Sequence, residues 1–185
     1  MFEILLTLGI YFLSALLPQA DIFPQSPTST PTPKKQEVLP AATLHAGDFI
    51  VTRVVDGDTI VVSDATTSYT IRLIGVNTPE TVDPRSEVEC FGMEASNKMK
   101  ELVEYKKVRL EQDPTQGNKD RYSRLLRYVY RDDGLFINKW LIEEGFAYEY
   151  TYNTPYRFQA EFKQSQRNAQ SGNKGLWNEM ICPRE

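Results

Sequence analysis

Residues 48–185 predict an α+β fold, a five-stranded OB-fold barrel with three helices. The first observation behind this prediction is a series of short β-branched and aromatic segments, which favour strands. The second is that the later segments alternate with stretches whose apolar residues recur at helical spacing. The resulting order is three strands, a helix, two strands and two helices. An OB barrel likewise places three strands before its helix and two after it.

The predicted strands lie at residues 49–55, 59–63, 69–74, 108–111 and 125–130. Asp56-Gly57 separates the first two strands and is a strong signal for a tight turn. A short polar turn separates the second strand from the third. We therefore expect the first three strands to pair as an antiparallel meander.

The predicted helices lie at residues 93–105, at residues 136–144 and from residue 154 onward. In the first helix, one face carries apolar residues at spacing i, i+4, i+7 and i+8, namely Ala95, Met99, Leu102 and Val103. Gly145 is a stop signal for the second helix. Thr154 and Pro155 are predicted to open the last helix as N-cap and first helical residue, and Gly172 is predicted to end it.

Two segments precede the predicted barrel domain. Residues 4–17 form an uncharged apolar run, which is too short for a comfortable membrane span and typical of a secretion signal. We interpret residues 1–20 as a signal peptide or an N-terminal membrane anchor; the alternative is a buried helix of the domain. Residues 21–47 are rich in Pro, Ser and Thr and are typical of a disordered linker. The protein is therefore expected to be secreted, or held outside the cytoplasm by this anchor.

Composition limits the chemistry available to the chain. The net charge of −4 argues, taken alone, against a nucleic-acid partner, because such domains are often basic. His45 is the single histidine of the sequence, so metal ligation by two histidines is excluded. The two cysteines, Cys90 and Cys182, are too few for a four-thiolate zinc site. In an exported domain they are expected to form one disulfide that ties down the C-terminal tail; the alternative is two free thiols.

Polar residues gather at the ends of the predicted strands, in residues 56–59, 77–80 and 120–124. The meander places Asp58 beside the turn that holds Asn77, Thr78 and Glu80. Carboxylate, amide and backbone carbonyl oxygens are ligands that suit Ca²⁺. The nearby Arg72 and the strand-end Arg124 favour a phosphate ligand. Each signal taken singly is also typical of an ordinary turn or a solvated ion pair.

Six segments in order resemble the staphylococcal (micrococcal) nuclease family, and they span nearly the whole domain: VVDGDTIVV, YTIRLIGVNTPET, VECFGMEAS, DRYSRLLRYVY, NKWLIEEGFAYEYTY and NKGLWNE. The resemblance implies that Asp58 is the aspartate that binds Ca²⁺ and that Thr78 ligates through its carbonyl. It implies that Arg72 and Arg124 stabilise the pentacoordinate phosphorus. Glu80 falls on the glutamate that acts on the attacking water.

The same resemblance implies a nucleotide pocket. Arg121 and Tyr122 fall on residues near the nucleotide phosphate, and Tyr150 and Tyr152 on tyrosines that line the pocket. Asp120 falls on an acidic neighbour of the second catalytic arginine. One departure is Asn77, where the best-known member has a second aspartate ligand; the amide keeps the oxygen and loses a charge, so weaker Ca²⁺ binding is expected.

The expected function is that of an exported, Ca²⁺-dependent nuclease that hydrolyses DNA and RNA with little sequence preference and leaves 3′-phosphate ends. No obligate protein partner is evident in the sequence, and we expect a monomer. The alternatives are a non-catalytic OB-fold module that binds nucleic acid or protein, and a surface-anchored structural module.

Overall fold

A computed structural model of the chain describes residues 48–81 and 89–183. The signal or anchor at 1–20 and the linker at 21–47 lie outside these residues. Within the described ranges, no helix is both long and apolar enough to span a membrane.

Five strands close the barrel, as predicted: β1 (Asp48–Val54), β2 (Thr59–Ser63), β3 (Ser68–Leu73), β5 (Lys107–Glu111) and β6 (Leu125–Arg131). Around the barrel the order is β1-β2-β3-β6-β5. The pairs β1–β2 and β2–β3 are antiparallel, which confirms the meander, and β3–β6 is the parallel pair that allows closure. Fully buried apolar side chains fill the interior, among them Val51, Ile60, Ile71 and Val129.

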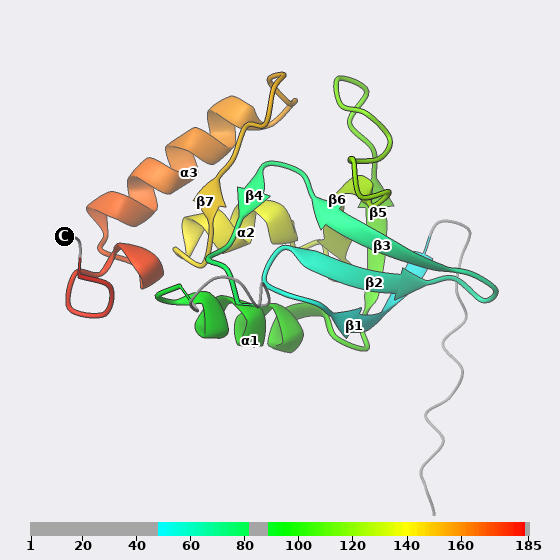
Figure 1. The fold of residues 1–185 in the computed structure, drawn as a ribbon, viewed down its shortest axis with the longest axis horizontal. Helices are drawn as coiled ribbons and strands as arrows, with labels where there is room; N and C mark the ends of the chain where they lie inside the picture. The colour runs from blue at the N-terminus through cyan, green and yellow to red at the C-terminus, as the bar shows by residue number, and fades with distance from the viewer. Residues whose placement is uncertain (1–47, 82–88, 184–185) are drawn as a thin grey trace, which may run out of the picture. The chain divides into compact units, whose positions relative to one another are not determined.

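Three α-helices accompany the barrel in the described residues: α1 (Gly92–Val103), α2 (Ile137–Glu143) and α3 (Gln159–Ser171), followed by the 3₁₀ turn η1 (Gly175–Trp177) (Figure 1). The predicted face of α1 is buried. Gly145 follows α2 with a φ of 73°, the left-handed conformation that suits glycine after a helix end. Two strands that the sequence did not predict, β4 (Val76–Asn77) and β7 (Tyr148–Glu149), pair outside the barrel.

The prediction that Thr154 and Pro155 open the last helix is wrong, because α3 begins at Gln159. Gln116 Nε2 donates to the carbonyl of Thr154 at 3.0 Å, and Thr115 Oγ1 donates to that of Pro155 at 3.2 Å. These carbonyls therefore serve contacts with a distant loop and not a first helical turn. The capping signal is local, whereas the competing hydrogen bonds come from residues about forty positions away in the chain.

The expected disulfide between Cys90 and Cys182 is present. It joins the turn before α1 to the C-terminal segment after η1, across 92 residues of sequence. Cys182 is buried, and its backbone N–H donates to the Asn178 carbonyl at 2.8 Å. The link therefore connects α1 to an ordered C-terminal turn.

Candidate active site

The site begins at the turn between β1 and β2, where the backbone places Asp58 beside Thr78. The N–H of Asp58 donates to Asp56 Oδ1 at 3.0 Å, which fixes the turn. A Cβ placed on Gly57 would lie 2.6 Å from Thr78 Cγ2, so only glycine permits this close approach. The sequence predicted that Asp58 lies beside the 77–80 turn, and the structure confirms it.

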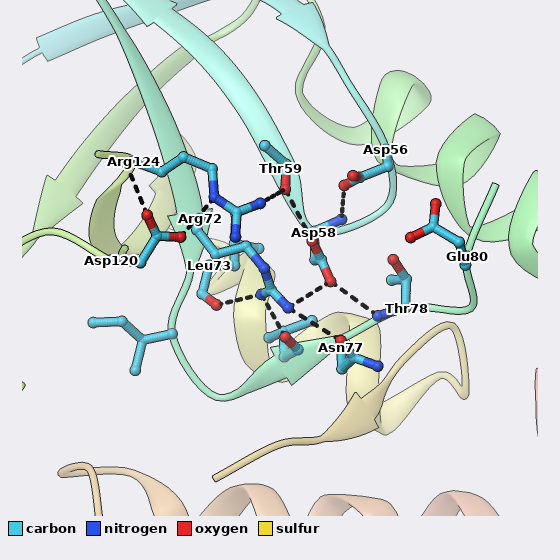
Figure 2. Close-up of polar contacts among 12 residues, drawn as sticks. Asp56, Asp58, Thr59, Arg72, Leu73, Asn77, Thr78, Glu80, Asp120 and Arg124 are labelled. Carbon is cyan, nitrogen blue, oxygen red and sulfur yellow. Dashed lines mark hydrogen bonds and ion pairs between the residues drawn. The ribbon is translucent and has the colours of Figure 1, made fainter. Parts of the chain in front are cut away.

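Asp58 is buried, and each of its carboxylate oxygens is held by a defined partner. Oδ2 accepts a hydrogen bond from the Thr78 N–H at 3.1 Å and forms an ion pair with Arg72 Nη2 at 2.9 Å. Oδ1 accepts a hydrogen bond from Thr59 Oγ1 at 3.0 Å. Figure 2 shows this carboxylate at the centre of the polar network.

Arg72 stands opposite Thr59 in the β2–β3 register, and main-chain carbonyls fix its guanidinium. Nη1 donates to the carbonyls of Leu73 at 2.9 Å and Val76 at 2.6 Å. Nη2 donates to Asn77 Oδ1 at 3.2 Å, in addition to its contact with Asp58. With so many partners the arginine head is preorganised, which is what a group that stabilises developing charge requires.

Arg124 reaches the same network from the start of β6. Its Nε donates to Asp120 Oδ2 at 2.7 Å, and its Nη1 to Thr59 Oγ1 at 3.3 Å. Burial acts to raise the pKa of the Asp120 carboxyl, but hydrogen bonds from the Arg124 side chain and from the backbone at 122 and 124 outweigh it and hold this pKa below its ordinary value. Asp120 is therefore a charged, fixed partner that orients Arg124.

The structure adds two residues that sequence reasoning had not placed in the site. Thr59 Oγ1 lies between Asp58 and Arg124 and joins the two halves of the network (Figure 2). Asp56 had been interpreted as a turn residue only, but burial and the nearby Asp58 charge raise the pKa of its carboxyl to about 6. The sequence offered one signal for it, the close spacing of two carboxylates in Asp-Gly-Asp.

Glu80 lies at the edge of this network. Its Oε1 accepts a hydrogen bond from the Thr81 N–H at 2.8 Å, and its own N–H donates to Glu89 Oε2 at 3.0 Å. In the view of Figure 2, Glu80 and Asp56 lie on the other side of Asp58 from Arg124. Glu80 follows Thr78 by two positions along the chain, and the Thr78 N–H binds Asp58.

A cavity of about 460 Å³ opens beside the arginines. Its lining includes all four predicted nucleotide-binding residues, Arg121, Tyr122, Tyr150 and Tyr152, together with Arg72, Arg124, Asn77 and Asp120. Asp58, Thr78 and Glu80 do not line it. The Tyr150 and Tyr152 ring centroids are 6.4 Å apart, and Arg121 lies 4.7 Å from the Tyr122 ring.

Several lining residues had no signal in the sequence, namely Thr115, Gln116, Lys119 and Tyr156. Tyr156 is buried, and its hydroxyl donates to Glu149 Oε1 at 3.0 Å. Gln116 binds the carbonyl of Thr154, as described above. The hydrogen bond from Gln116 to Thr154 joins two loops distant in sequence into one wall of the cavity.

The oxygen atoms around Asp58 have the chemistry of a hard-cation site. In the ranges 48–81 and 89–183, no group of three or more His, Cys, Asp or Glu side chains could hold a metal ion. A cation would therefore depend on the Asp58 carboxylate with amide and carbonyl oxygens, a donor set that suits a hard divalent ion. The repulsion between Asp56 and Asp58 fits such an ion, because a positive charge there would relieve it.

The family model for "Staphylococcal nuclease homologue" matches residues 70–179, more than half of the chain. The chain belongs to this family. It is 42% identical to a thermonuclease of Staphylococcus hyicus over 130 residues, which cover 70% of this chain and 75% of that protein. It is 39% identical to endonuclease YncB of Bacillus subtilis over 152 residues, which cover 80% of this chain and 67% of that protein.

A thermonuclease of Staphylococcus intermedius is 39% identical over 129 residues, which cover 70% of this chain and 75% of that protein. These relatives support a nuclease function for this chain, and therefore its assignment as a hydrolase. The resemblance to the staphylococcal nuclease family that the six sequence segments indicated is confirmed.

Proposed function

We propose that this chain is an exported, Ca²⁺-dependent endonuclease that hydrolyses phosphodiester bonds of DNA and RNA with little sequence preference and leaves 3′-phosphate ends. The observation that carries the proposal is the placement of Arg72 and Arg124. Both guanidiniums line one cavity, and both connect to the Asp58 carboxylate, one directly and one through Thr59.

The two arginines have complementary roles in phosphoryl transfer. Planar guanidinium groups bind phosphate oxygens through two parallel N–H donors. Asp120 holds Arg124 through Nε, so its terminal nitrogens are oriented to donate to an equatorial oxygen of the phosphorus. The two terminal nitrogens of Arg72 already donate to protein acceptors, so Arg72 would donate to the phosphate through Nε or exchange one of these acceptors for a phosphate oxygen. Together they stabilise the transition state and the departing 5′ oxygen.

Glu80 acts on the attacking water as its orienting group and proton acceptor. A carboxylate in this role must lie within hydrogen-bond reach of a water placed in line with the leaving oxygen. The Thr81 N–H donates to Glu80 Oε1, and this hydrogen bond orients the carboxylate. His45 is the single histidine of the sequence, and it lies before the domain. This supports a carboxylate, and not a histidine, as the proton acceptor.

Asp58, the Asn77 amide oxygen and the carbonyl of residue 78 would hold Ca²⁺. When bound, the ion would supply positive charge that polarises a phosphoryl oxygen. Arg72 Nη2 already contacts both Asp58 and Asn77, at 2.9 Å and 3.2 Å, so these side chains are held in place by the arginine before any cation binds.

Asn77→Asp tests this ligand set. A second carboxylate adds charge to the donors, and Ca²⁺ affinity rises with the number of charged ligands. We expect the Ca²⁺ concentration for half-maximal cleavage to fall by about tenfold, with kcat changed less. Calcium titrations of both proteins under identical ionic strength measure it. An unchanged or higher requirement would remove Asn77 from the ligand set.

Thr59→Val tests the bridge between the two halves of the site. Valine keeps the shape and removes the hydroxyl, so Asp58 Oδ1 loses its donor and Arg124 loses an acceptor. We expect kcat to fall by about tenfold, because small displacements of catalytic groups are costly. Thr59→Ser is the control that keeps the hydroxyl and should stay near wild-type activity. Equal activity of the valine and serine variants would show that the bridge is dispensable.

The tyrosines at the cavity support tolerance for any base. Tyr122, Tyr150 and Tyr152 are exposed, so their rings are open to a ligand. Stacking of a base on an aromatic ring does not require a particular base, because every base has a π-face. The exposed tyrosine rings therefore support both DNA and RNA as substrates.

The overall acidic charge is compatible with this proposal. Net charge describes the whole surface, whereas Arg72, Arg121 and Arg124 concentrate at one cavity. A bound cation also changes the local sign of the potential. We expect modest affinity for long DNA, with binding that depends on the cavity more than on a broad basic face.

The function is tested by incubating the purified protein with plasmid DNA and with RNA, in Ca²⁺ and in EGTA. We expect both polymers to be degraded in Ca²⁺, with 3′-phosphate ends, and the rate to fall at least about a hundredfold in EGTA. Binding of labelled single-stranded DNA without turnover would favour the non-catalytic module instead. Equal turnover in Ca²⁺ and EGTA would contradict the calcium dependence.

A further inference from the structure

The backbone of Glu80 is hydrogen-bonded to Glu89. The Glu80 N–H donates to Glu89 Oε2 at 3.0 Å, and the Glu89 N–H donates to the Glu80 carbonyl at 3.0 Å. Both main-chain groups of Glu80 are thus bound to the same residue nine positions later. Since hydrogen bonds at an exposed surface contribute only about 1 kcal/mol each, these two contacts need a fixed Glu89 to hold Glu80 firmly.

The start of α1 fixes Glu89 beside residues 79–81. The Gly92 N–H donates to the Glu89 carbonyl at 3.1 Å. A Cβ placed on Gly92 would lie 2.5 Å from Thr81 Cγ2 and 3.1 Å from the Glu80 carbonyl oxygen. The helix start therefore packs directly on residues 79–81, and any shift of this turn shifts Glu80 with it.

The disulfide lies next to Glu89 in the chain. Cys90 joins this turn to Cys182, and the C-terminal turn there is itself ordered. Leu176 and Trp177 are buried in a small cluster with Ala169 and Phe91, and the Leu176 N–H donates to the Gly145 carbonyl at 2.9 Å. The covalent link therefore anchors the turn of Glu89 to a packed part of the domain.

We propose that Glu89 is a positioning residue for Glu80, and that the Cys90–Cys182 disulfide holds Glu89 in place for this purpose. The inference rests on the proposed role of Glu80 in hydrolysis. The disulfide accordingly supports the rate of the reaction as well as the stability of the fold. A displacement of about 1 Å in such a group can cost up to about a hundredfold in rate.

A double-mutant cycle tests the coupling. Cys90→Ser with Cys182→Ser is introduced into wild type and into Glu80→Gln, and kcat, KM and the thermal midpoint are measured for all four proteins. In the wild-type background we expect kcat to fall by about tenfold with KM little changed. In the Glu80→Gln background we expect no further fall in kcat, because the group being positioned has gone. The thermal midpoint should fall by the same amount in both backgrounds.

Two kinetic results would overturn the proposal. One is an unchanged kcat after removal of the disulfide from the wild-type background. The other is the same fall in kcat in both backgrounds, which is the behaviour of a link that supports only the fold. Either result leaves the proposed function standing when wild type cleaves in Ca²⁺, whereas a wild type without turnover would refute the function itself.

Glu89→Ala provides a test that keeps the disulfide. We expect the same fall in kcat as in the disulfide variant, again absent in the Glu80→Gln background. Glu94→Ala is the matched control, because Glu94 is an exposed glutamate in the first turn of α1. Equal kcat in the Glu89→Ala and Glu94→Ala proteins would contradict the positioning role.

Discussion

Replacing Arg72 with alanine is expected to lower kcat by about three orders of magnitude at saturating Ca²⁺. The guanidinium is fixed by two main-chain carbonyls, Leu73 and Val76, and lines the cavity in which the phosphate is proposed to bind. Loss of one preorganised group that stabilises transition-state charge costs about 10²–10³ in rate, and loss of an arginine at a transferred phosphate about 10³–10⁵. Single-turnover cleavage of a labelled oligonucleotide measures the effect on the chemical step.

Two further variants separate catalysis from folding. Arg72→Ala also leaves the buried Asp58 carboxylate without its ion-pair partner, so the protein should be less stable. Arg72→Lys keeps the positive charge and loses the fork of donors, and we expect it to remain far below wild type in kcat. Arg167→Ala is the control, because Arg167 is exposed on α3 and contacts Gln164. Wild-type rates in Arg72→Lys would show that charge alone suffices.

Replacing Glu80 with glutamine is the second large effect. The amide keeps the size of the side chain and removes the basic carboxylate that acts on the attacking water. General base catalysis contributes about 10²–10⁴ in rate, so kcat should fall by about that factor. KM should change little, because Glu80 does not line the cavity. Steady-state kinetics on single-stranded DNA separate the two constants.

The pH dependence of kcat provides a second test with the Glu80→Gln variant. With a carboxylate base removed, the acidic limb of the profile of kcat against pH should flatten, provided that Ca²⁺ is saturating at each pH. Glu94→Gln is the control, since this glutamate is exposed on α1 and does not line the cavity. A Glu80→Gln enzyme with the wild-type rate and profile would remove Glu80 from the mechanism.

The barrel was predictable because its signals are local. Short β-branched and aromatic segments and the Asp56-Gly57 turn define the strands of the meander, and helical spacing defines α1. The strand ends then bring Asp58 to Thr78 and Arg72, and the structure confirms this placement. The order of the six family motifs supplied the remaining predicted residues around the cavity.

What escaped prediction depends on contacts between distant segments. Thr59 acts as a bridge only because β6 places Arg124 within 3.3 Å of its hydroxyl. Tyr156 lines the cavity because a loop, and not a helix, carries it there, and that loop is set by Gln116. The two-residue strands β4 and β7 are too short to give a periodic signal.

The most direct test of the proposed active site is single-turnover cleavage of labelled single-stranded DNA in Ca²⁺ by wild type and by the Arg72→Ala, Arg124→Ala double variant, with DNA binding measured in parallel. We predict that wild type cleaves, and that the folded double variant binds DNA more weakly and, at DNA concentrations that saturate it, cleaves at least about 10³-fold more slowly. Cleavage by the double variant at the wild-type rate would contradict the proposal that these two arginines act on the phosphate.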